Sequence, residues 1–385
     1  MQTTASPDRP VTRLTGMTWD HPRGVDGLRV ANEVIAERHG AVVDWEARSL
    51  LAFGDQQVAD FAGDFDLLVI DHPHVPDAVE SGALLALDDH LDGATLATLE
   101  RESVGASHES YGYRGHHWSL AIDAAAQVSA FRPDLCDGAP VYWDDVLAMP
   151  GGTVLWPHKP VDAFSTFATL LAQRASPLAQ AANFLDREAA AGVLEFMIRL
   201  AETVPEWCAN ANPIDVAEAL ATTDDHAVAV ALFGYTNYSR AGFRPHAIAY
   251  DDIPSFDGRA SGSTLGGAGI AVSSSTSHPE LAAAIACSLA GGTVQAGPYT
   301  AGGGQPGNLR AWRSEARNAE THNFFRNTLR TLERAWVRPR VLGWPDLQLA
   351  LSHIVHDSLT ARRFDERTLD ALEALPATHL KEPIA

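Results

Sequence analysis

The sequence has little cysteine, no long apolar run and a shortage of positive charge. Its three cysteines, Cys136, Cys208 and Cys287, lack metal-ligand spacing, and an odd, sparse set indicates buried or free thiols in a reducing compartment. No segment approaches the roughly 18 apolar residues that cross a bilayer, so we expect no membrane insertion. The formal net charge of −21 argues against nucleic acid as a partner, because phosphate binding depends on Lys and Arg.

A secretory leader is also lacking at the start of the sequence. Residues 1–12 are polar, contain proline and have no apolar segment of the roughly 7–15 residues that export requires. Together with Met1 this favours a cytoplasmic protein. The alternative is that a signal was removed and that the protein works in the periplasm or at the cell surface. We expect residues 1–12 to form a flexible tail.

The first seventy residues alternate between strand and helix patterns. Residues 14–19 and 41–48 are typical of strands, and the apolar spacing between them predicts a helix that ends at Gly40. A short helix at 56–61 leads to an apolar strand at 66–71, typical of a parallel strand covered on both faces. This order predicts the beginning of a doubly wound α/β fold.

The rest of the chain is richer in helix. Residues 163–204 and 319–375 have helical spacing, and residues 228–233 and 269–272 are typical of short buried strands. Ser277 and Glu280 have the spacing of a capping box that opens a helix over 281–289.

Two motifs rich in acid and histidine follow probable strands, where open α/β sheets bind their ligands. They supply the candidate ligand-binding residues Trp19, Asp20, His21, Arg23, Asp71, His72 and His74. These side chains could hydrogen-bond a polar ligand, perform acid–base chemistry or hold a metal. No spacing matches a zinc signature, so we expect no metal. The structural alternative is that Asp20 and Asp71 cap helices and that the histidines are exposed.

Several further segments carry a family resemblance when they are taken in order. They are residues 80–91, 111–115, 119–123, 131–135, 266–273 and 277–282. Over residues 13–375 the chain resembles the extracellular solute-binding proteins of ABC sugar importers, the family that includes maltose-binding protein.

The resemblance implies a periplasmic-binding-protein-like type II α/β fold, with a ligand cleft between two lobes and crossovers that act as a hinge. One lobe would span 13–123 plus 263–313 and the other 124–262 plus 314–385. A small-molecule ligand would bind in the cleft, and closure around it would be a hinge motion. We expect a monomer without a cofactor, and an ABC permease as partner if the chain is exported.

The resemblance also points to ligand-binding residues away from the first two motifs. It implies Tyr235 and Trp344 as aromatic contacts and Asp123 as an acid at the hinge. Further candidates are Trp156, Asn237 after a buried strand, and Gln305 in a glycine-rich loop. Packing in the core is the alternative for each aromatic residue. Arg338 could recognise an anion, although a solvated face is the simpler interpretation.

Three functional hypotheses follow. The first is a receptor for a sugar-like or other small polar metabolite. The second is a cytoplasmic enzyme that uses the same cleft, with His72, His74, His21 and Asp71 in general acid–base catalysis. The missing leader and the density of imidazole favour this second hypothesis. The third is a structural or partner-binding protein with a vestigial cleft, for which the sequence contains no positive sign.

Overall fold

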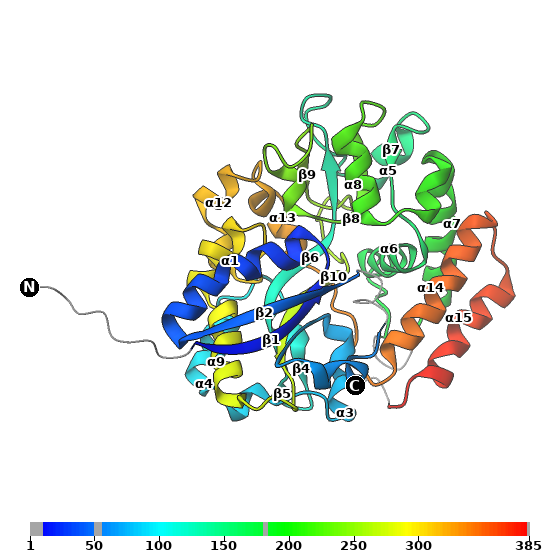
Figure 1. Cartoon of the computed structure of the whole chain (residues 1–385). Coiled ribbons are helices and arrows are strands. Elements are labelled where there is room, and N and C mark those ends of the chain that lie inside the picture. The colour runs from blue at the N-terminus through cyan, green and yellow to red at the C-terminus, as the bar shows by residue number, and fades with distance from the viewer. Residues whose placement is uncertain (1–10, 50–55, 180–183, 383–385) are drawn as a thin grey trace, which may run out of the picture.

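One path of paired strands runs through the computed structural model, which describes residues 11–49, 56–179 and 184–382 (Figure 1). The strands pair in the order β2-β1-β3-β10-β6-β8-β7, and β9 pairs with β6 beside this path. The strands are β1 Thr12–Trp19, β2 Ala41–Arg48, β3 Leu67–Ile70, β6 Ser119–Phe131, β7 Val154–Leu155, β8 Val228–Phe233, β9 Ala249–Asp251 and β10 Leu265–Val272, with a separate hairpin of β4 Gly112–Tyr113 and β5 His116–His117.

Helices cover both faces of this path (Figure 1). They are α1 Pro22–His39, α3 Val75–Glu80, α4 Gly93–Arg101, α5 Trp143–Ala148, α6 Pro160–Gln173, α7 Arg187–Thr203, α8 Pro213–Thr222, α9 Pro279–Ala290, α10 Gly292–Val294, α11 Leu309–Trp312, α12 Glu315–Ala319, α13 Phe324–Glu333, α14 Trp344–Thr360 and α15 Glu366–His379. Within the described ranges no single helix is long and apolar enough to span a membrane; α9 and the segment from Gly292 to Tyr299 pass that test only together, across a 49° bend.

The N-terminal segment has the predicted doubly wound beginning. Strand β1 pairs in parallel with both β2 and β3, so the carboxyl ends of β1 and β3 lie at the same edge of the sheet. Pro22 in the first turn of α1 and a left-handed Gly40 after its last turn set the two ends of the connecting helix. These local signals explain why the predicted bounds of β1, α1 and β2 are close to the observed ones.

Strand β6 joins two sheet segments with separate cores. Its residues 119–126 pair with β10, and its residues 127–131 pair with β8. One pair of cores lies on the two faces of the segment that contains β1 and β3, and a larger core surrounds the segment that contains β8. The predicted lobe boundary at 123/124 falls within β6, and the exact lobe boundaries remain a prediction.

Two local predictions differ from the structure. The capping box at Ser277 and Glu280 is wrong, because α9 begins at Pro279 after His278 and has no side-chain cap. The Glu280 carboxylate instead lies 2.9 Å from the His90 imidazole, a tertiary contact that spacing alone does not reveal. The predicted short helix at 56–61 is a 3-10 turn at Val58–Asp60. Strand β1 begins at Thr12, the last residue of the predicted tail, and residues 1–10 lie outside the described part.

Candidate functional site

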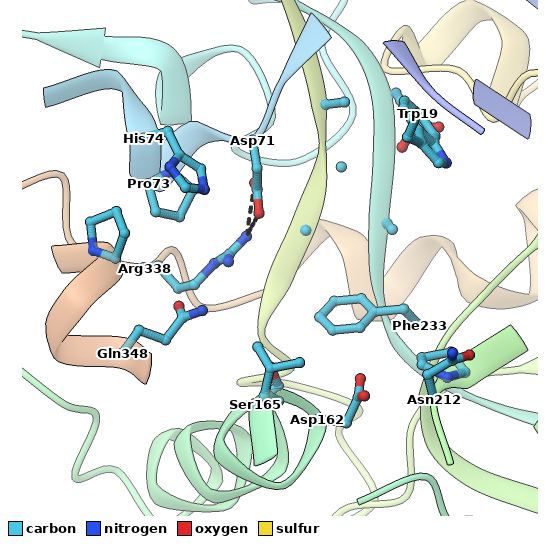
Figure 2. Close-up of a pocket in the computed structure, with 18 of the residues that line it drawn as sticks. Trp19, Asp71, Pro73, His74, Asp162, Ser165, Asn212, Phe233, Arg338 and Gln348 are labelled. Atoms are coloured by element: carbon cyan, nitrogen blue, oxygen red, sulfur yellow. Dashed lines mark hydrogen bonds and ion pairs between the residues drawn. The ribbon is translucent and has the colours of Figure 1, made fainter. Parts of the chain in front are cut away.

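A cavity of about 370 Å³ lies between the two sheet segments, beside β6 and β10, the paired strands that connect them (Figure 2). Its wall includes Trp19 at the end of β1, Asp71 after β3, Asp123 on β6 and Gly266 to Ala268 on β10. The other side of the wall comes from Phe233 and Tyr235 and from the first turns of α6, α8 and α14. The cavity therefore combines the ends of parallel strands with the starts of several helices.

A buried ion pair forms the floor of the cavity beside β6. Arg23, in the first turn of α1, donates to both carboxylate oxygens of Asp123, at 2.8 Å from Nε and 2.5 Å from Nη2. Its Nη1 donates to the Gly234 carbonyl oxygen at 2.9 Å, and its guanidinium lies 4.5 Å from the centre of the Tyr235 ring. Burial raises the pKa of Asp123, and the charge of Arg23 opposes that rise. The pair connects α1 to β6 and to the segment after β8.

A second ion pair, between buried Arg338 and half-buried Asp71, lies on another side of the cavity, as the dashed lines in Figure 2 show. Arg338 Nη2 donates to the two oxygens of Asp71 at 2.9 and 2.7 Å. Burial alone would raise the pKa of Asp71, but Arg338 and the hydrogen bond from His72 hold it well below its usual range. The interpretation of Arg338 as part of a solvated face is wrong, because its side chain is buried against Asp71.

One buried carboxylate in the cavity lacks such a partner among the described residues. Asp162, in the first turn of α6, is 4% exposed, and no described residue donates a hydrogen bond to its side chain. Burial raises the pKa of Asp162 to about 7, although the nearby charge of Lys159 acts in the opposite direction. Figure 2 shows the carboxylate pointing into the cavity beside Ser165.

The structure brings six of the sequence-predicted binding residues together at this wall. They come from four separate parts of the chain and are Trp19, Arg23, Asp71, His74, Asp123 and Tyr235. Trp19 and His74 are both buried side chains. The two acid–histidine motifs thus meet at one cavity, as expected for parallel neighbours, although only part of each motif faces it.

The other seven predicted residues lie outside the cavity wall, and their contact with a ligand remains a prediction. They are Asp20, His21, His72, Trp156, Asn237, Gln305 and Trp344. Asp20 is exposed and caps no helix; the His21 ring instead accepts from the Arg23 backbone N–H and caps α1. His72 is buried, and its ring lies perpendicular to the Tyr111 ring.

Packing explains the position of the remaining four. Trp156 lies in the core, where its indole N–H donates to Thr166 and its ring stacks on His158. Trp344 is fully buried, and its indole N–H donates to Gln348. Gln305 and Asn237 join backbone segments that are distant in the sequence. Gln305 accepts a hydrogen bond from the Thr236 backbone N–H and donates one to the Ala124 carbonyl oxygen on β6. Asn237 donates a hydrogen bond to the Gly303 carbonyl oxygen.

The four residues proposed for catalysis are not assembled as one group. Asp71 and His74 line the cavity, whereas His21 and His72 do not. Burial, reinforced by nearby arginines, lowers the pKa of both His21 and His72 to about 4, so both rings are neutral at pH 7. Among the described residues, no group of three or more His, Cys, Asp and Glu side chains is arranged to hold a metal ion.

Several cavity residues were missed from sequence. The polar ones are Gln57, Lys159, Asp162, Ser165, Asn212, Asp346 and Gln348. All but Gln57 lie at or near the starts of α6, α8 and α14, each of which has a proline within its first two positions. Proline in the first turn marks a helix start in the sequence, and exposed N–H groups there suit polar ligands. That signal could have located these residues, although not their convergence.

Comparison with known proteins identifies the fold. No family model and no curated protein sequence matches the chain. Similar solved structures include maltose-bound MalE3 of T. maritima, with 17% identity, a TM-score of 0.78 and coverage of 95% of this chain and 100% of that one. An ABC transporter solute-binding protein of Agrobacterium radiobacter K84 with ribitol has 18% identity, a TM-score of 0.78 and coverage of 96% and 99%. One from Thermotoga lettingae with α-D-tagatose has 17% identity, a TM-score of 0.78 and coverage of 95% and 99%. The predicted periplasmic-binding-protein-like type II fold is confirmed.

Proposed function

We propose that the protein is a receptor that binds a sugar or polyol in the cavity between its two sheet segments. The observation that carries this proposal is the cavity itself. Its volume of about 370 Å³ lies within the range of small-molecule sites, roughly 300–1,000 Å³. Its wall pairs fixed polar groups with the rings of Trp19, Phe233 and Tyr235, and ring faces stack on the apolar faces of sugars while the polar groups bind hydroxyls.

The structural neighbours support the same class of ligand. Their structures hold maltose, ribitol and α-D-tagatose, and two of them are solute-binding proteins of ABC transporters. A receptor of this kind would close its two halves around the ligand and deliver it to a permease. The hinge would lie at β6 and β10, the strands that connect the two sheet segments.

Ligand titration tests the proposal. The native chain is titrated with maltose, ribitol, tagatose and related sugars and polyols, while tryptophan fluorescence and thermal unfolding are followed. We expect a saturable change with at least one member, because Trp19 lines the cavity. Absence of any fluorescence change and any thermal stabilisation with every neutral and amine-bearing sugar and polyol tested would contradict the proposal.

A pair of variants links binding to the cavity. Phe233→Ala removes a half-buried ring that faces the cavity and should weaken binding about tenfold, since an aromatic contact contributes about 1 kcal/mol beyond its area. Phe256→Ala is the control, because Phe256 is an exposed ring outside the cavity wall and should leave affinity unchanged. Equal effects of the two substitutions would place the binding site elsewhere.

A further inference from the structure

The charged groups of the cavity fall into two classes. Arg23 is neutralised by Asp123, and Arg338 is neutralised by Asp71, so neither pair carries net charge toward a ligand. The remaining charged side chains of the wall are Lys159, Asp162 and Asp346. Of these three, only Asp162 is buried; Asp346 is exposed and Lys159 is half-buried.

Asp162 therefore presents an unbalanced buried carboxylate to the ligand. It forms no ion pair within 4.0 Å and accepts no hydrogen bond from the described residues. Leaving an ionised carboxylate buried and unpaired is costly, so a cation that enters beside it gains a strong interaction, whereas an anion is repelled. The protein therefore lacks a positive charge beside Asp162, and a ligand could supply it.

A second side-chain oxygen near Asp162 on α6 belongs to Ser165. Ser165, one turn further along α6, donates its hydroxyl hydrogen to the Val161 carbonyl oxygen at 2.8 Å. Ser165 also lines the cavity, and its oxygen keeps lone pairs that can accept a hydrogen bond. An ammonium group has three donors and no acceptor, so the Asp162 carboxylate and the Ser165 oxygen together can take two of them.

Two features oppose a cation here. The N-terminal end of α6 carries about half a positive charge, and Lys159 adds its own charge at the same end of the helix. The full charge of Asp162 exceeds the helix contribution. Lys159 is also only half-buried, so water screens its ammonium more than it screens Asp162.

We propose that the ligand carries a protonated amine that binds beside Asp162, so that the preferred solute is an amino sugar or an amino polyol. This inference rests on the proposed receptor function and narrows its ligand class. It assigns Asp162 as the residue that selects amine over hydroxyl at one position of the ligand.

Matched pairs of probes test the inference. Affinities are measured calorimetrically at pH 7, where the amines are protonated, for glucosamine against glucose and for glucamine against sorbitol, together with the neutral panel described above. We expect at least one amine to bind about tenfold more tightly than its hydroxyl analogue, as a charge-assisted hydrogen bond to a buried carboxylate requires. In Asp162→Asn that ratio should fall below about threefold.

A control variant separates the site from general charge effects. Asp144→Asn removes an acid that also lies in the first turn of a helix, α5, but is exposed and outside the cavity, and it should keep the tenfold preference. Thermal unfolding checks that each variant is folded. If Asp162→Asn does not fold, Asp162→Ser removes the same charge with a smaller side chain.

Each outcome decides the matter. Neutral sugars or polyols that bind as tightly as their amines would overturn the inference and leave the receptor function standing; Lys159 would then be the counter-charge of Asp162. An amine preference that survives the loss of the Asp162 carboxylate would also overturn it. If no neutral or amine probe binds at all, the receptor function itself fails.

Discussion

Replacing Arg23 by methionine will leave the Asp123 carboxylate buried without its partner. Both side chains are almost inaccessible, at 5% and 1% exposed, so water cannot replace the lost hydrogen bonds. The Asp123 carboxylate must then stay charged in an apolar setting or take up a proton. Either route destabilises the folded state, because the unfolded chain solvates the same carboxylate freely.

The size of the loss follows from the second route. Protonating a carboxyl with an ordinary pKa of 3.8 at pH 7 costs about 4 kcal/mol, at about 1.4 kcal/mol for each pH unit. Loss of the hydrogen bond from Arg23 to the Gly234 carbonyl adds about 1 kcal/mol. We therefore expect the free energy of unfolding to fall by about 4–5 kcal/mol at pH 7, in line with other broken buried pairs.

Urea unfolding followed by fluorescence measures this change. The part that arises from protonation should shrink to about 2 kcal/mol at pH 5, because protonation becomes easier as the pH falls. Arg13→Met is the matched control: Arg13 pairs with Asp44 on the surface, with side chains 69% and 58% exposed, and should cost less than about 1 kcal/mol. The double substitution Arg23→Met with Asp123→Leu should recover more than half of the loss. A loss below about 1 kcal/mol at pH 7, or one that does not change with pH, would refute the reasoning.

Two further predictions concern stability at acid pH and the backbone of β10 at Gly267. Burial lowers the pKa of four histidines to about 4, namely His21, His72, His108 and His158. Because the unfolded chain then binds more protons than the folded one between pH 6.5 and 4, each histidine should lower the free energy of unfolding by up to about 2 kcal/mol at pH 5. The raised pKa of Asp162 stabilises the folded state as the pH falls and offsets the loss from about one histidine. The urea midpoint should therefore still fall from pH 7 to pH 5, and it should fall less steeply in His158→Gln. A midpoint that does not change with pH would contradict this prediction. Gly267→Ala should destabilise by more than about 1 kcal/mol, since φ is +122° and the new Cβ would lie 2.4 Å from the Asp123 carbonyl oxygen, whereas Gly93→Ala, with nothing within 4 Å, should be neutral in the same thermal unfolding assay.

The predicted elements were most accurate where local chemistry sets them. Strand β8 occupies the predicted range 228–233, and β2 occupies 41–48, because both are short apolar or alternating runs between clear breaks. The helix at 281–289 was expected to open with a capping box, yet His278 and Pro279 start it. Glu280 could not be placed from its spacing, because its partner, His90, is distant in the sequence.

In the candidate site, too, the residues that local sequence signals mark could be located, and those that depend on distant packing could not. Trp19, Arg23 and Asp71 could be located because they lie at or just after the ends of strands, and the ends of parallel neighbours share one edge of a sheet. Asp162 and Gln348 could not, since each lies near the start of a helix whose direction depends on packing in the second sheet segment.

The sequence alone determined the α/β class, the order of the N-terminal strands and the acid–histidine edge, because propensity, periodicity and caps act over a few residues. Only the tertiary structure decided which polar groups face the cavity and which charges are already neutralised. Arg338 pairs with Asp71, and Asp162 forms no ion pair with any described residue, because burial and ion pairing depend on segments that only the fold brings together. That difference in pairing is the basis on which Asp162 is proposed to bind a charged group of the ligand.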